Sequence, residues 1–267
     1  MESTLFYLAL GFYLVATLAY LCPLVIKEGF ISRLASASAL LGFGAHSLAL
    51  LTRIYRAGHP PLSNLYESLS VFAWAFVLIY LFIEFRYKNK GIGSFVMPIV
   101  LLALGTAAAL PKTFQELMPR LQSFWLDLHV GLVLVGIAAL VFASCAAFMY
   151  LLQERQLKSK NPGAFSRRLP SLELLDRLGY RSLSWGFPLF TLGLITGTIW
   201  AGYAWGTYWA WNPKETTGLM TWVIYAALLH ARLSFGWRGR KAAVLSLIGF
   251  GAIVFAFFGV SFSESGG

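Results

Sequence analysis

The sequence predicts an all-α, polytopic membrane protein with about eight transmembrane helices and both termini outside. Three observations predict this class: the composition, the length of the apolar runs and the distribution of basic residues. Hydrophobic residues make up 58% of the chain and charged residues only 12%, about half of the roughly 25% that is usual in soluble domains. A soluble fold of 267 residues could not bury that much apolar surface. The same composition excludes disordered, collagen-like and disulfide-scaffold proteins.

Eight apolar runs come close to the length that a membrane-spanning helix needs, about 20 residues. In chain order they are 4–26, 34–55, 68–85, 92–110, 125–152, 184–204, 217–233 and 242–262. The first run follows Glu2 and lacks a basic leading segment, so we interpret it as a helix and not as a cleaved signal peptide. The fourth and sixth runs contain Pro98 and Pro188, which could break their helices.

The basic residues predict the orientation of these helices. Sixteen of the 21 Lys and Arg residues fall on one set of connecting loops, and five fall on the other set. The positive-inside rule assigns the richer loops to the cytoplasm, so both termini are expected on the periplasmic or equivalent outer face. This bias explains the net charge of +10 without a nucleic-acid partner. We therefore expect a multi-pass protein of the cell inner (cytoplasmic) membrane, in contact with membrane lipid.

No internal repeat is evident, and we interpret residues 1–267 as a single integral-membrane domain. Residues 153–183 are expected to form a cytoplasmic linker, with a short surface helix over 172–179, and residues 203–216 an outer Trp-rich loop. The two cysteines lie far apart inside apolar runs, and the chain has neither a CxxC nor a CxxCH motif. Thioredoxin-like redox chemistry is therefore disfavoured, and the chain is not itself a c-type cytochrome.

The outer Trp-rich loop is the first candidate for function. Four of the nine tryptophans fall between residues 200 and 215, and an aromatic belt at the membrane interface would explain one or two of them. It does not explain their close spacing beside an Asn-Pro-Lys-Glu segment. A platform of indole faces beside a few polar groups suits a large, flat, apolar ligand. We therefore expect Trp205, Trp209 and Trp211 to contact such a ligand.

The histidines are the second candidate. His129 is expected at the outer start of the fifth helix, level with the Trp-rich loop, and His59 in the outer loop after the second helix. His46 falls in the middle of the second helix and His230 near the inner end of the seventh. A membrane histidine usually faces a partner or ligand, and neutral imidazole is a common ligand of haem iron. Haem is thus the leading ligand, although each histidine could instead serve packing and no HxxxH spacing is present.

The segment that opens the third helix has a structural interpretation. Asn64 or Ser63 is expected to cap this helix, and Glu67 lies where a helix N-terminus stabilises negative charge. A functional role for these residues is the alternative.

Residues 205–216, which read Trp-Gly-Thr-Tyr-Trp-Ala-Trp-Asn-Pro-Lys-Glu-Thr, resemble the WWD signature of haem-handling membrane proteins. The Pro-Lys-Glu ending resembles the CcsA (ResC) branch of system II cytochrome c biogenesis more than the CcmC and CcmF proteins. Further stretches of this chain resemble CcsA proteins in the same way. They are residues 52–69, 125–130, 229–239 and 259–260.

The resemblance implies haem delivery at the outer membrane face for covalent attachment to c-type apocytochromes. It implies haem b as a bound substrate, and as partners apocytochrome c and a CcsB (ResB)-like membrane protein. His129 then matches an axial ligand of haem under the WWD loop. His230 matches a ligand of haem within the membrane, with the opposite ligand from the partner. Whether the chain is an enzyme, as part of a CcsBA-type holocytochrome c synthase (haem lyase), stays open.

Two departures from the family pattern leave alternatives. Asn212 stands where the family usually has Asp, and no histidine follows the last apolar run. The partner or His59 could complete the outer haem site, or one histidine alone could hold the haem. The alternative functions are a HemX-like membrane protein that regulates tetrapyrrole synthesis and a haem transporter.

Overall fold

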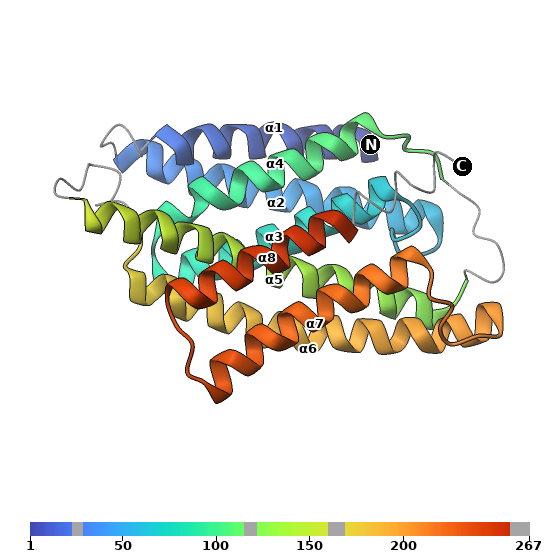
Figure 1. Cartoon of the computed structure of the whole chain (residues 1–267). Helices are drawn as coiled ribbons and strands as arrows, with labels where there is room; N and C mark the ends of the chain where they lie inside the picture. The colour runs from blue at the N-terminus through green and yellow to red at the C-terminus, as the bar shows by residue number, and fades with distance from the viewer. Residues whose placement is uncertain (23–28, 115–121, 160–168, 257–267) are drawn as a thin grey trace. The chain divides into compact units, whose positions relative to one another are not determined.

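The computed structural model describes residues 1–22, 29–114, 122–159 and 169–256, and their regular secondary structure is entirely helical (Figure 1). The prediction of an all-α fold is therefore confirmed. The C-terminal segment 257–267, in which the sequence has no histidine, lies outside the described residues. Within them, the α-helices in chain order are α1 (Glu2–Leu21), α2 (Gly29–Ala57), α3 (Leu65–Tyr87), α4 (Gly93–Ala109), α5 (Phe124–Lys158), α6 (Leu172–Trp205), α7 (Pro213–Ser234) and α8 (Arg240–Val254).

Each of the eight predicted apolar runs corresponds to one helix, and six segments are long and apolar enough to cross a membrane. These six are α1, α2, α3, the segment Lys90–Ala109, α5 and α6. The chain is therefore a multi-pass membrane protein. The other two helices are shorter or more polar: α8 has 15 residues, and α7 carries Lys214 and Glu215 in its first turn and His230 and Arg232 near its end.

Several helices are longer than their apolar runs. The largest difference is at α6, which is one continuous helix from Leu172 and not a separate surface helix followed by a span. Ser171 caps it by accepting a hydrogen bond from the Leu174 N–H, and Glu173 pairs with Arg177 one turn later. These polar residues extend the helix, but they do not raise its hydropathy, so a search for apolar runs does not include them. Pro98 and Pro188 lie inside unbroken helices.

The chain divides into two compact units. The first contains α1 to α4 with the last residues of α5, and the second contains α5 up to Glu154 with α6, α7 and α8. In the first unit α1 packs on α2 and α4, and α3 packs on α4. Small residues allow the helices to approach closely: a Cβ at Gly42 would lie 2.7 Å from the ring of Tyr13.

One end of the first unit is held by a buried ion cluster. Arg53 is 2% exposed and donates to Glu2 at 2.8 Å and to Glu67 at 2.6 Å. Glu67 also accepts the backbone N–H of Ser63 at 2.7 Å. The Asn64 side chain accepts the Glu67 N–H at 2.9 Å, so the predicted cap of the third helix is confirmed and Asn64 provides it.

Glycines also bring α5 and α6 together in the second unit. A Cβ at Gly136 would lie 2.7 Å from the Phe190 backbone nitrogen, and one at Gly193 would lie 2.6 Å from the Val133 side chain. Such close approach replaces the hydrophobic driving force that membrane helices lack. It fixes the height of α5 against α6, and therefore the position of the residues near the start of α5 and the end of α6.

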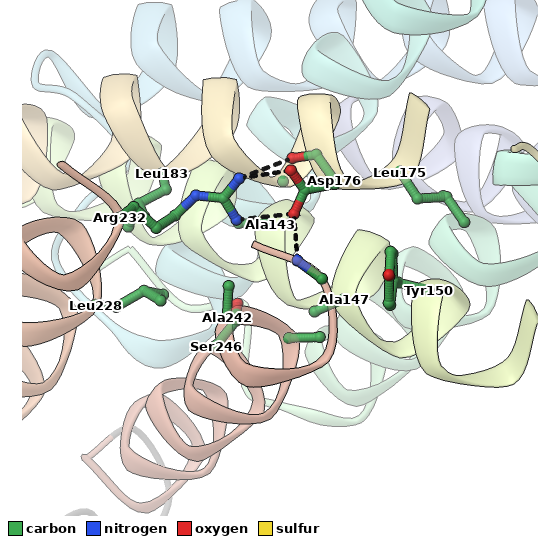
Figure 2. A pocket seen from close by; sticks show the side chains of 13 residues that line it. Ala143, Ala147, Tyr150, Leu175, Asp176, Leu183, Leu228, Arg232, Ala242 and Ser246 are labelled. Atoms are coloured by element: carbon green, nitrogen blue, oxygen red, sulfur yellow. Dashed lines mark hydrogen bonds and ion pairs between the residues drawn. The ribbon is translucent and has the colours of Figure 1, made fainter. Parts of the chain in front are cut away.

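A salt bridge joins the start of α6 to the end of α7. Figure 2 shows the Arg232 guanidinium facing the Asp176 carboxylate, with nitrogen–oxygen distances of 3.1 and 2.8 Å. The same carboxylate accepts the Gly239 N–H at 3.1 Å, which ties the start of α8 to α6. The pocket drawn in Figure 2 is only about 20 Å³, which is room for a water molecule. A second pocket of about 310 Å³ is lined by the same pair together with Glu173, Arg177, Tyr180, Trp237 and Arg238.

Candidate functional site

The second unit has a half-open cavity of about 530 Å³, lined by residues near the end of α6 and the start of α7. One wall comes from α5 and the last turns of α6, and the other from the connecting segment 206–212 and the first turn of α7. The lining residues are His129, Leu194, Gly197, Thr198, Trp200, Ala201, Trp205, Thr207, Tyr208, Trp209, Ala210, Asn212, Lys214 and Glu215. The volume lies in the range of ordinary small-molecule and cofactor sites.

The segment between α6 and α7 is shaped by its caps. Gly206 ends α6 in the left-handed conformation (φ 73°), and its N–H reaches the Gly202 carbonyl at 3.1 Å. Asn212 begins α7 by accepting the Glu215 N–H at 2.8 Å, and Pro213 follows at the first helical position. The Glu215 carboxylate reaches back to the Ala210 N–H at 2.7 Å. These bonds hold the loop over the cavity.

The cap also explains why Asn212 is compatible with the family pattern. Asn and Asp are about equally good at a helix N-cap, because either side-chain oxygen can accept the N–H. The substitution therefore keeps the local fold of the loop. It removes one negative charge from the cavity wall, to which Asn212 belongs.

The imidazole of His129 is oriented by its own hydrogen bond. Its Nδ1 lies 2.6 Å from the Gly193 carbonyl oxygen, which can only accept, so Nδ1 carries the proton and donates it. The Nε2 atom is then the unprotonated nitrogen, and no described residue is hydrogen-bonded to it. An imidazole held in this way through Nδ1 is the usual form of a metal-ligating histidine.

Small residues on α6 make room for this ring. A Cβ at Gly197 would lie 2.5 Å from Nδ1 and 2.6 Å from Cε1 of His129, so only glycine permits the observed packing. Thr196 donates its hydroxyl to the same Gly193 carbonyl at 2.9 Å. The sequence analysis did not find these three residues, since their role depends on the packing of α5 against α6.

The tryptophans form two edge-to-face pairs. Trp200 and Trp205 have ring centroids 6.1 Å apart at 82°, and Trp209 and Trp211 are 5.7 Å apart at 81°. The structure thus brings Trp205 and Trp209 to the same cavity as His129. Trp211 is not a lining residue; it is 69% exposed and packs against Trp209. Trp200 lines the cavity as well, and its place in the same cluster of tryptophans was the available signal.

The remaining histidines lie elsewhere. His230 is exposed on α7, where its Nδ1 is 3.3 Å from the Ser234 hydroxyl. His59 belongs to the first unit, and its Nδ1 lies 2.9 Å from the Pro60 carbonyl oxygen, so Nδ1 donates there. His46 is fully buried and bonded to Ser70 at 2.9 Å, which is a packing role.

Among the described residues, no group of three or more His, Cys, Asp or Glu side chains could hold a metal ion.

The family model for the cytochrome c assembly protein matches residues 62–266. The chain belongs to the cytochrome c assembly protein family. It is 35% identical to the cytochrome c biogenesis protein CcsA of Pyropia yezoensis, over 100% of this chain and 96% of that protein. It is 40% identical to CcsA of Prochlorococcus marinus subsp. pastoris, over 81% of this chain and 76% of that protein.

A solved structure of the cytochrome c haem lyase CcmF is similar in fold. The TM-score is 0.70 with 19% identity, and the match covers 97% of this chain and 46% of that chain. This chain thus spans less than half of the CcmF chain. The resemblance to the CcsA proteins is confirmed, and family membership assigns the chain to the maturation of c-type cytochromes.

Proposed function

We propose that the chain holds haem b as a bound substrate in the cavity of the second unit and presents it for covalent attachment to apocytochrome c. The observation that carries the proposal is the His129 ring, which lines an indole-walled cavity with its Nδ1 proton already donated. His129 Nε2 would ligate the iron, and Trp205 and Trp209 would contact the faces of the macrocycle.

The role of the chain in thioether formation is positioning. Each new bond joins a thiol sulfur of the apocytochrome CxxCH motif to a vinyl carbon of haem, and the thiol hydrogen passes to the other vinyl carbon, so no oxidant is consumed. Holding the two reactants in contact can supply a large part of the rate. The residues of this chain would fix the ring plane and leave the vinyl edge accessible.

Orientation follows from the charge bias. We propose that the cavity faces the outside of the cytoplasmic membrane, because sixteen of 21 basic residues lie on the opposite set of loops. A fusion of alkaline phosphatase after residue 210 should then be active, and a fusion after residue 165 should be inactive. The reverse activities would overturn the orientation.

His230 fits a separate role on the route of haem across the membrane. It lies 17 residues after the start of α7, about 25 Å along the helix axis from the cavity end. It is exposed on the helix surface, where a CcsB-like partner could supply an opposing ligand. His59 is a candidate second ligand for the outer haem, and the partner or no second ligand are the alternatives.

A visible absorption spectrum of the purified protein, alone and with a CcsB-like partner, tests the proposed function. We expect haem to co-purify and to show the spectrum of imidazole-ligated iron. His59→Ala should change this spectrum only if His59 is the second ligand. A protein that carries no haem, and takes up none on titration with or without the partner, would refute haem binding. If the protein instead alters the expression of tetrapyrrole-synthesis genes, the HemX-like alternative would be favoured.

A further inference from the structure

The indole nitrogen of Trp209 is a buried donor without an acceptor. Of the buried side-chain nitrogen and oxygen atoms in the described part of the chain, Trp209 Nε1 has no hydrogen-bond partner. Buried donors are nearly always satisfied in folded proteins, and an exception calls for a cause. An indole N–H can only donate, so whatever satisfies it must bring an acceptor.

The loop around Trp209 is otherwise well bonded. The Ala210 N–H is bound by Glu215 at 2.7 Å, and the Trp209 carbonyl accepts from the Thr207 hydroxyl at 3.1 Å. Beyond it, the Trp211 carbonyl accepts from Thr216 at 3.3 Å. The unpaired N–H therefore lies in a loop whose neighbouring backbone groups are hydrogen-bonded.

A second unfavourable feature lies two residues away. Trp211 has φ 57°, in the left-handed region that non-glycine residues rarely adopt. Strained residues of this kind gather at ligand-binding sites, where the ligand-bound state compensates for them. The indoles of Trp209 and Trp211 touch edge to face, so the two features belong to one small segment.

The charges near this segment favour an anionic acceptor. Trp209, Lys214 and Glu215 all line the cavity, and the cavity lies at the N-terminal end of α7. The Lys214 and Glu215 side chains have opposite charges, and a helix N-terminus carries a partial positive charge. The Glu215 carboxylate is already engaged with the Ala210 N–H.

We propose that Trp209 Nε1–H donates a hydrogen bond to a carboxylate of the ligand in this cavity. The inference rests on the proposed function, in which the ligand is haem and the carboxylates are its propionates. Trp209 lines the cavity, and its indole N–H is buried without an acceptor among the described residues. The bond directs the propionate edge of haem toward the start of α7 and leaves the vinyl edge on the other side.

The experiment compares two probes, iron protoporphyrin IX and its dimethyl ester, which has the same ring without free carboxylates. Both are titrated into the purified full chain and into Trp209→Phe, which keeps an aromatic face and loses the N–H. The wild type should bind the free acid roughly tenfold or more tightly than the ester, as expected for a charge-assisted hydrogen bond. In Trp209→Phe this preference should fall about tenfold, because the N–H is lost while an aromatic face remains.

Trp205→Phe is the matched control, because Trp205 lines the same cavity and should keep the wild-type preference. An unchanged preference in Trp209→Phe would overturn the inference, and so would an equal loss of both probes. Failure of the wild type to bind either probe would refute the proposed function instead, so the two failures are distinguishable.

A measurement on the wild type avoids dependence on the variant. The indole hydrogen-bonding band in ultraviolet resonance Raman difference spectra should shift with the free acid and not with the ester. The same shift with both probes would contradict a bond to the carboxylate.

Discussion

At one end of the first unit, buried charged side chains are paired with one another, whereas two ring nitrogens at the cavity of the second unit have no hydrogen-bond partner among the described residues. Arg53 is fully engaged by Glu2, Glu67 and the backbone carbonyls of Lys112 and Thr113. Trp209 Nε1 has no partner, and no described residue bonds to His129 Nε2. The ion cluster thus stabilises the fold of the first unit, whereas the two unpaired nitrogens of the second unit are the basis of the proposed ligand site.

The largest expected effect is a loss of stability at the buried ion cluster of the first unit. Arg53→Ala leaves Glu2 and Glu67 as buried carboxylates without their cation, and breaking a buried pair in this way costs about 3–5 kcal/mol. We expect a much lower melting temperature, or loss of folded protein in detergent. The control is Glu173→Gln, which breaks the exposed pair with Arg177 and should change stability little. Similar melting of both variants would show that the cluster does not stabilise the first unit.

The next largest effect should be a loss of haem affinity without a loss of folded protein. Gly197→Ala places a methyl group against Nδ1 and Cε1 of His129, so the ring must move and release the Gly193 carbonyl. Haem affinity should fall more than tenfold, measured by titration followed in the visible spectrum. Gly131→Ala on α5 is the control, because a Cβ there meets nothing within 4 Å. Equal affinities in the two variants would contradict the seating of His129 on Gly197.

The smallest effect concerns the cap at the edge of the cavity. Asn212→Ala removes the acceptor of the Glu215 N–H and should cost about 1 kcal/mol. Asn212→Asp should be nearly neutral for stability, since Asp caps as well as Asn. Thermal melting of the two variants against the wild type measures both. If Asn212→Asp destabilises as much as Asn212→Ala, the residue has a role beyond capping.

The helices and the site differ in how far the sequence predicts them. The apolar runs predict all eight helices, and the loop charges with the Trp cluster predict that His129 lies level with Trp205 and Trp209, as the shared cavity shows. The sequence predicts a short surface helix over 172–179 but not its continuation into α6, because the residues between them are partly polar and a membrane-length criterion registers only apolar ones.

The fine geometry of the site could not come from the sequence. The proton on His129 Nδ1 depends on the Gly193 carbonyl, 64 residues away, and the space for its ring depends on Gly197. These contacts exist only once α5 and α6 have packed. The lack of a hydrogen-bond acceptor for Trp209 Nε1 likewise depends on the folded arrangement of the loop.

The most direct test of the account is chemical rescue at His129. His129→Gly removes the imidazole that lines the cavity and leaves a space that free imidazole can enter. The account predicts that the purified variant loses haem or shows an altered spectrum, and that added imidazole restores the wild-type spectrum. Wild-type haem content and an unchanged spectrum in His129→Gly, without imidazole, would contradict the claim that His129 ligates the iron.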